Sequence, residues 1–167
     1  MKLLVLADTH LRTVPDGSMR RWLPPAAEPR LEAADVILHA GDLLDEGVLG
    51  RLRSYAPVYA VLGNNDRDLV GALPQTLLVD LDGIRIGMVH DSGPAAGRAR
   101  RLRRWFPDAD VVVFGHSHAP INGPGEEGQV LFNPGSPTQR RAQPSHSLGE
   151  LVIHDETIVD RRIVILD

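Results

Sequence analysis

The chain has 167 residues, 43% hydrophobic and 24% charged, the composition of an ordinary single-domain protein with a substantial core. It contains no cysteine, so disulfides and thiolate metal sites are excluded and any metal must be held by oxygen and imidazole nitrogen. The net charge of −4 argues against nucleic acid as a partner, and no run approaches the roughly 20 apolar residues of a membrane span.

The first third of the chain alternates apolar runs with other segments. Residues 2–7, 36–40 and 58–62 are typical of strands that are covered on both faces. The first run is too short for a signal peptide, so we expect a cytoplasmic protein. Residues 11–30 are rich in proline and predict an irregular excursion with a helical turn near 19–23. Residues 30–34 are predicted to form a brief helix or the last turn of one, and a further helix is predicted at 47–55.

Later segments are joined mainly as hairpins. An Asp-Gly turn predicts a hairpin between 76–81 and 84–89, and a C-terminal hairpin joins 148–153 to 158–166. An amphipathic helix is expected at 95–106, with five arginines on its solvated side and an inward stripe of Ala99, Leu102, Trp105 and Phe106. Further strands are expected at 111–114 and 129–132. This mixture predicts one α/β domain over residues 1–167 with more than one sheet.

Polar side chains follow six of the predicted strands at the point where each strand ends. Ligand crevices of open α/β sheets lie at the carboxyl ends of the strands, so we expect these side chains to share one place. Carboxylate, amide oxygen and imidazole suit divalent metal ions, and the set is large enough for two. Taken singly, each aspartate could be a helix cap and the first asparagine a turn residue. The set is Asp8, His10, Asp42, Asn64, His90, His116, His118 and Asn133.

The order of these motifs carries a resemblance. Asp-x-His, Gly-Asp, Gly-Asn-x-Asp, His and Gly-His-x-His, between residues 8 and 118, resemble the calcineurin-like metallophosphoesterase family. Asn-Pro-Gly-Ser-Pro at 133–137 is similar to a segment of the small single-domain bacterial and archaeal phosphodiesterases of that family. The resemblance implies an α/β fold, a four-layer α/β/β/α sandwich of two mixed β-sheets flanked by helices.

The resemblance also implies a dinuclear metal centre. Mn²⁺ is the expected metal, with Ni²⁺, Zn²⁺, Fe²⁺ and Mg²⁺ as alternatives. Two cations about 3.5–4 Å apart would acidify a bridging water, and the resulting hydroxide would attack phosphorus in line with the leaving oxygen. The implied ligands are Asp8, His10 and His118 for the first ion, Asn64, His90 and His116 for the second, and Asp42 bridging both.

Two positions depart from the family pattern. Many members have a histidine after Gly-Asn that protonates the leaving group, but here the residue is Asn65, whose amide gives up no proton near pH 7. We therefore expect Asn65 to bind a phosphate oxygen and Asp66 to support the loop. Asp91 stands where glycine is frequent and would either alter the turn or accept a hydrogen bond. Because Asn65 cannot protonate a leaving group, substrates with poor leaving groups are expected to react slowly.

Several residues outside the ligand set have two interpretations. Arg140 and Arg141 would clamp a substrate phosphate, or else form an exposed loop pair. Residues 11–30, which include Arg20, would form a lid, a subunit contact or a disordered loop. His39 would support the ligands or pack in the core.

The predicted function is that of a metal-dependent phosphodiesterase acting on small phosphodiesters or nucleotides, with no membrane or nucleic-acid partner and with a homo-oligomer as an open possibility. A phosphomonoesterase is the nearest alternative. A second alternative is a noncatalytic protein-interaction scaffold of the same fold, as in a retromer subunit that resembles these enzymes. A metal- or nucleotide-binding module without turnover is the third.

Overall fold

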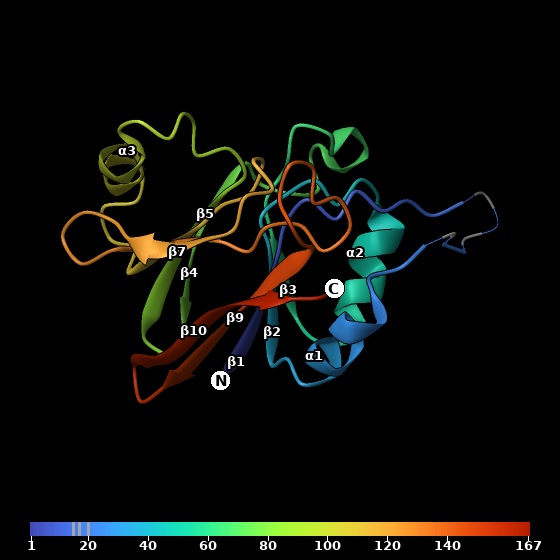
Figure 1. Cartoon of the computed structure of the whole chain (residues 1–167), viewed down its shortest axis with the longest axis horizontal. Helices are drawn as coiled ribbons and strands as arrows, with labels where there is room; N and C mark the ends of the chain where they lie inside the picture. Colours follow the sequence, from blue (N-terminus) through green and yellow to red (C-terminus); the bar gives the residue numbers. More distant parts are fainter. Residues whose placement is uncertain (15, 17, 20) are drawn as a thin grey trace.

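The computed structural model describes residues 1–14, 16, 18–19 and 21–167, which form two mixed five-stranded sheets (Figure 1). The first sheet has the order β10 (Thr157–Ile165), β9 (Ser147–His154), β1 (Lys2–Leu6), β2 (Val36–His39) and β3 (Val58–Ala60). The second has the order β4 (Thr76–Leu81), β5 (Ile84–Val89), β6 (Val111–Val113), β8 (Val130–Asn133) and β7 (Ile121–Pro124).

Helices cover the outer faces of the two sheets. α1 (Glu28–Glu32) and α2 (Glu46–Arg53) lie on the first sheet, and α3 (Arg98–Trp105) lies on the second, at the opposite side of the molecule (Figure 1). Two short 3₁₀ turns, η1 (Pro25–Ala27) and η2 (Arg67–Leu69), complete the elements. Among the described residues, no helix is both long and apolar enough to cross a membrane.

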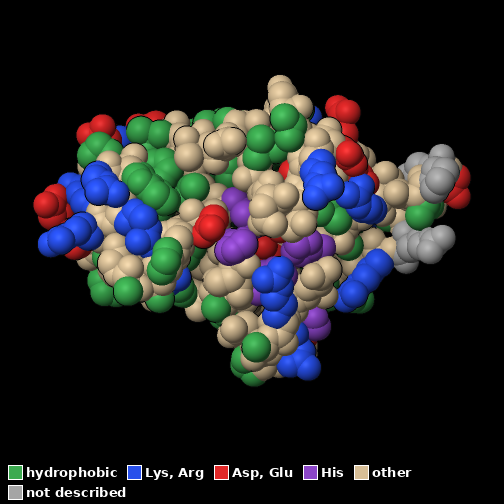
Figure 2. All heavy atoms as spheres, turned by 90° about the horizontal axis from the view of Figure 1, so that it is seen from above, with side chains coloured by type: hydrophobic (Ala, Val, Ile, Leu, Met, Phe, Trp, Pro, Cys, Tyr) green, Lys and Arg blue, Asp and Glu red, His purple; other side chains and the backbone are tan. Residues whose placement is uncertain are grey.

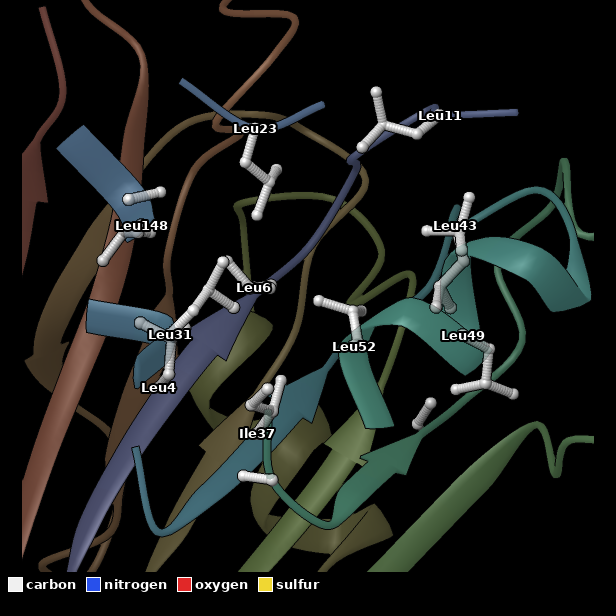
Figure 3. Packing of buried hydrophobic residues seen from close by; sticks show 14 of the residues in the cluster. Leu4, Leu6, Leu11, Leu23, Leu31, Ile37, Leu43, Leu49, Leu52 and Leu148 are labelled. Carbon is white, nitrogen blue, oxygen red and sulfur yellow. The ribbon is translucent and has the colours of Figure 1, made fainter. Parts of the chain in front are cut away.

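The side chains of β1 alternate between the two faces of the first sheet and pack against the layers on both sides. Leu4 and Leu6 pack against α1 and α2, where Leu31 and Leu52 point back toward the sheet (Figure 3). The intervening Leu3 and Val5 belong to the core between the two sheets. A strand directs successive side chains to opposite faces, so one nearly continuous apolar run can serve both layers. A third cluster lies under α3. The four-layer α/β/β/α sandwich is confirmed.

Several predicted elements need correction. Among the described residues of 19–23, which exclude Arg20, no helical turn occurs, and Met19 instead forms an isolated bridge with Thr13. The brief helix begins earlier than predicted, at Glu28, because Pro29 is tolerated in a first helical turn. β7 was not predicted, since its glycine and proline resemble a turn; as an edge strand beside β8 it tolerates them.

The helix at 95–106 is shorter and oriented differently from the prediction. α3 begins only at Arg98, after Gly97 with φ of 70°. Leu102 and Phe106 form its buried line, whereas Trp105 is 44% exposed and lies within 5.9 Å of the Arg101 guanidinium. Trp105 lies beyond the narrow stripe that an eight-residue helix buries, so its assignment to the core was wrong.

The sheet topology places the carboxyl ends of six parallel strands at one edge of the sandwich. β1, β2 and β3 run parallel in the first sheet, and β5, β6 and β8 run parallel in the second. Each of these strands leads directly into one of the polar clusters identified in the sequence.

Candidate metal centre

The first half of the site joins the loops after β1 and β6. His118 Nε2 lies 3.4 Å from Asp8 Oδ1 and 3.3 Å from His10 Nε2. His10 Nε2 also lies 3.6 Å from Asp42 Oδ2, at the end of β2. Potential ligand atoms of Asp8, His10 and His118 all lie within 4.8 Å of one another, a spacing that one metal ion could fill.

The second half joins the loops after β3, β5 and β6. Asn64 Oδ1 lies 3.1 Å from His90 Nε2 and 3.1 Å from His116 Nδ1. His90 Nε2 is 3.5 Å from Asp42 Oδ2. The same Asp42 oxygen therefore faces His10 in one half and His90 in the other, which is the position expected of a bridging carboxylate. The structure brings all seven predicted ligands together.

Asp8 is the least satisfied group of the site. It is 0% exposed, and neither carboxylate oxygen has a hydrogen-bond partner. Burial, reinforced by the charge of Asp42, raises the pKa of Asp8 to about 8. A buried carboxylate without partners is costly, and a bound cation would remove that cost. The donor set around Asp8 therefore fits a metal ion.

The neighbouring imidazoles are held in the neutral form that metal ions need. Burial lowers the pKa of His118 to about 4 and also lowers the pKa of His10 and of His90. A neutral imidazole keeps a lone pair for a metal.

The unused ring nitrogens of two histidines are anchored to backbone carbonyls. His90 Nδ1 donates to Ala40 O at 2.7 Å, and His118 Nδ1 donates to Gln139 O. These contacts direct each Nε2 toward the aspartates, as outer hydrogen bonds of metal-binding histidines do. His116 differs, since its Nδ1 faces Asn64 and its Nε2 lies 4.0 Å from Asp91 Oδ2.

Asn65 and Asp66 both act on the loop that carries Asp42. The Asn65 backbone N–H donates to Asp42 Oδ1 at 2.9 Å, and its side-chain amide donates to Oδ2 at 2.7 Å. Burial raises the pKa of Asp42, but these bonds and the nearby imidazoles outweigh it, so the pKa lies below its usual value. Asp66 accepts from the backbone N–H groups of Asp42, Leu44 and Gly63 at 2.7–2.8 Å.

Backbone strain coincides with the ligands. Positive φ values are rare for residues with a side chain, cost of order 1–3 kcal/mol each and cluster at functional sites. Hydrogen bonds from Asp8 N to Gly41 O and from His10 N to Asp42 O help to hold this backbone. Five of the seven ligands have such values: Asp8 (53°), His10 (46°), Asp42 (60°), His116 (66°) and His118 (56°).

Two glycines are required by the close approach of the carboxylates. A Cβ at Gly63 would lie 2.2 Å from Asp42 Oδ1, and a Cβ at Gly115 would lie 2.8 Å from Asp8 Oδ2. Both distances are shorter than any side chain could accept without displacing the ligand.

The segment after β8 braces the site in a way that the sequence did not suggest. Ser136 Oγ donates to Asp8 O at 2.8 Å, and Thr138 Oγ1 donates to Thr9 O at 2.5 Å. Asn133 Nδ2 donates to Gly115 O at 3.0 Å, so Asn133 supports the histidine loop. The run of hydroxyl residues after a strand end was the available signal for this bracing.

His39 packs beneath the ligands. Its side chain is buried, and its Nε2 lies 3.1 Å from Thr9 Oγ1, between Asp8 and His10 in the chain. Burial lowers the pKa of His39 to about 3, so it is a neutral core residue that also contacts the first ligand loop.

Of the two arginines after the bracing segment, one faces the site. Arg140 Nη1 donates to Gln143 O and Pro144 O, within its own loop. Arg141 Nη1 donates to His116 O at 3.3 Å, and its charge contributes to lowering the pKa of His118. Figure 2 shows histidine side chains gathered near the middle of one face, with Lys and Arg side chains beside them.

The described part of residues 11–30 is fastened to the loops around the site. Arg12 Nη1 lies 3.0 Å from Asp68 Oδ2, and Thr13 N donates to Asp45 Oδ2 at 2.7 Å. Arg21 Nη2 donates to Thr138 O at 3.4 Å. Arg20 lies outside the described residues.

Known proteins share this arrangement of strands and motifs. Residues 1–156 match the calcineurin-like phosphoesterase superfamily domain. The chain is 36% identical over 143 residues to a probable metallophosphoesterase of Methanothermobacter thermautotrophicus, with 84% of this chain and 80% of the relative covered.

Solved structures agree on the fold. An archaeal phosphodiesterase superposes with a TM-score of 0.73 at 18% identity, covering 99% of this chain and 100% of the other. Zinc-bound Vps29 of Entamoeba histolytica superposes with a TM-score of 0.72 at 23% identity, covering 100% of both chains. The sequence match and the common fold together lead to one conclusion: this chain belongs to the calcineurin-like phosphoesterase superfamily.

Proposed function

We propose that the chain is a two-metal phosphodiesterase that hydrolyses small phosphodiesters or nucleotides. The observation that carries this proposal is the environment of Asp8. Its carboxylate is completely buried and has no hydrogen-bond partner. It is surrounded by the imidazoles of His10, His90 and His118. Buried charged groups are paired or coordinate metal ions, and a cation beside Asp8 would compensate its carboxylate.

The ligand roles follow from the two halves of the site. Asp8, His10 and His118 would hold one ion, Asn64, His90 and His116 the other, and Asp42 would be a ligand of both. Mn²⁺ is the proposed ion in the cell. When bound, the two ions supply an acidified water and positive charge for the phosphoryl oxygens. The protein's own contribution is to fix these ligands before substrate arrives.

The protein positions three of the ligands through different neighbours. The carbonyls of Ala40 and Gln139 orient His90 and His118, and Asp66 holds the backbone of the Asp42 loop. Removal of such an outer contact typically lowers metal affinity or activity by about 10–100-fold. The arrangement therefore suits a rigid site in which bound metal ions would neutralise the negative charge of a phosphoryl group.

A noncatalytic scaffold is the second candidate. Vps29 of Entamoeba histolytica has the same fold and forms a complex with zinc, so metal binding alone does not distinguish an enzyme from a scaffold. Turnover is the discriminating property. The retention of all seven ligand types favours the enzyme.

The test begins with protein stripped of metal. Hydrolysis of bis(p-nitrophenyl) phosphate and p-nitrophenyl phosphate is measured before and after addition of Mn²⁺, Ni²⁺, Zn²⁺ or Mg²⁺, while calorimetry counts the bound ions. We expect metal-dependent cleavage that is faster for the diester and absent in Asp42→Ala. Asp108→Ala, at an exposed turn after α3, serves as the matched control. Two bound ions without turnover of either ester would instead support the scaffold, and faster monoester cleavage would support a phosphomonoesterase.

A further inference from the structure

Each carboxyl and imidazole group at the centre of the site already accepts hydrogen bonds or belongs to the predicted metal ligands. Asp66 accepts three backbone N–H groups with its two oxygens and is 1% exposed. The other carboxyl and imidazole groups of the cluster are in the ligand set: Asp8, His10, Asp42, His90, His116 and His118. None of these groups is free to give a proton to a leaving oxygen.

The two remaining polar neighbours do not fill this gap. Asn65 is an amide, and its side chain is directed at Asp42 rather than outward. Asp91 lies at the exposed rim, where Oδ1 accepts from Gly93 N at 2.7 Å and Oδ2 lies 4.0 Å from His116 Nε2. Asp91 is thus turned toward the histidine loop.

A site without a proton donor discriminates between leaving groups. A sugar hydroxyl must leave as an alkoxide, whose conjugate acid is nearly as weak an acid as water. A phosphate group has its second pKa near 6, so it leaves as an anion at neutral pH without receiving a proton. The chemistry of the site therefore favours cleavage of a P–O–P bond.

Arg141 provides a contact for the second phosphate of such a bond. Its backbone is strained, with φ of 51°, and its Nη1 donates to the carbonyl of the ligand His116 at 3.3 Å. It is exposed and, within the part of the chain that the structure describes, forms no ion pair with a carboxylate. A guanidinium with unused donors beside the predicted metal ligands is suited to a phosphate oxygen.

We propose that the natural substrate is a phosphoanhydride such as a nucleoside polyphosphate, with the phosphate next to the scissile one bound by Arg141. This inference rests on the function proposed above. Water attacks the scissile phosphorus, the P–O–P bond breaks, and its electron pair remains on the oxygen of the departing phosphate. One proton of the attacking water passes to solvent, and the products are two phosphate compounds.

The first experiment compares leaving groups in one Mn²⁺-loaded preparation, with bis(p-nitrophenyl) phosphate as the reference ester. ATP and diadenosine tetraphosphate are compared with 3′,5′-cyclic AMP and adenylyl-(3′→5′)-adenosine, with products identified by ³¹P NMR. We expect kcat/KM to be at least about 100-fold higher for the anhydrides, a factor that a missing proton donor accounts for. Equal or faster cleavage of the alkyl diesters would overturn the inference while leaving the proposed function intact. Loss of activity on every ester and anhydride would overturn both.

A binding experiment tests Arg141 without turnover. The affinity of α,β-methylene-ADP is measured by calorimetry for the wild-type protein, Arg141→Ala and Arg140→Ala. We expect Arg141→Ala to weaken binding by about 10–100-fold, the usual range for a hydrogen bond to a charged group. Arg140, which donates within its own loop, is the matched control and should change the affinity less than about 3-fold. Equal effects of the two substitutions would remove Arg141 from the proposal.

Two further variants test whether the site lacks a proton donor for the leaving group. Asn65→His should raise kcat/KM for the alkyl diesters more than for the anhydrides, because an imidazole at this position can protonate an alkoxide. Asp91→Asn should leave the ratio between the two substrate classes within about 3-fold of wild type. If Asp91→Asn selectively abolished alkyl diester cleavage, Asp91 would be the proton donor and the inference would fail.

Discussion

Asn65 binds both oxygens of Asp42, through its backbone N–H at 2.9 Å and its side-chain amide at 2.7 Å. The side chain therefore supports the carboxylate that lies between the two halves of the site. Asn65→Ala should raise the pKa of Asp42 and weaken metal binding about 10-fold, as loss of an outer hydrogen bond does. Turnover of nitrophenyl esters should fall but persist at saturating metal, since their leaving groups need no proton. Calorimetry and initial rates over a metal titration measure the two effects. Abolished turnover at saturating metal would show that Asn65 contacts the reacting phosphate.

The raised pKa of Asp8 predicts how metal binding depends on pH. Burial raises its pKa to about 8, so the metal-free site holds a proton that a metal ion must displace. Affinity should rise between pH 6.5 and 8, with about one proton released per protein near pH 7. Calorimetry in buffers with different ionisation enthalpies measures this release. Asp8→Asn should bind metal more weakly and lose the pH dependence, and an unchanged dependence in this variant would contradict the assignment to Asp8.

The same shift predicts the stability of the metal-free protein. Above pH 7.5 the histidines are almost entirely neutral in both states, while Asp8 stays partly protonated only in the folded protein. The folded state then binds more protons than the unfolded state, so stability falls as pH rises from 7.5 to 9, by up to about 1 kcal/mol. Urea unfolding in excess chelator at pH 7.5 and 9 checks the sign. A rise in stability over this window would show that Asp8 is ionised in the folded chain.

Asp66 and Asp68 are separated by one residue and should behave very differently. Asp66→Ala leaves the buried N–H groups of Asp42, Leu44 and Gly63 without acceptors, which should destabilise the protein by about 3–5 kcal/mol. Asp68 forms an exposed pair with Arg12, so Asp68→Ala should cost less than about 1 kcal/mol. Chemical unfolding of both variants in chelator isolates this effect from metal binding. Similar losses for the two variants would mean that Asp66 does not carry the loop.

The sequence predicts most of the site because its signals are local. Each parallel strand is an apolar run, and the ligand follows within a few residues, so placing the strands also places Asp8, Asp42, Asn64 and His90. The direction of the Asn65 amide could not be inferred, since it depends on Asp42, 23 residues away along the chain. A contact with substrate phosphate therefore stays a prediction for Asn65.

Contacts between residues far apart in the sequence also determine other features of the fold that the sequence did not predict. The proline- and glycine-containing β7 is ordered by pairing with β8, and Trp105 is exposed because α3 offers only a narrow buried stripe. Neither outcome is encoded in a local pattern of apolar residues. The bracing of the first ligand loop by Ser136 and Thr138 joins residues more than 125 positions apart. Long-range hydroxyl contacts of this kind leave only a weak trace in the sequence.

Thr138 offers a test of that bracing. Its hydroxyl donates to Thr9 O at 2.5 Å, between two candidate ligands, and the side chain is buried. Thr138→Val keeps the volume but leaves the Thr9 carbonyl without this donor, which should cost about 1–2 kcal/mol and reduce metal affinity by about 10-fold. Thr138→Ser keeps the hydroxyl and should retain nearly the wild-type affinity. If valine and serine gave the same metal affinity in calorimetry, the hydroxyl would have no part in holding Asp8 and His10, and packing alone would position the first ligand loop.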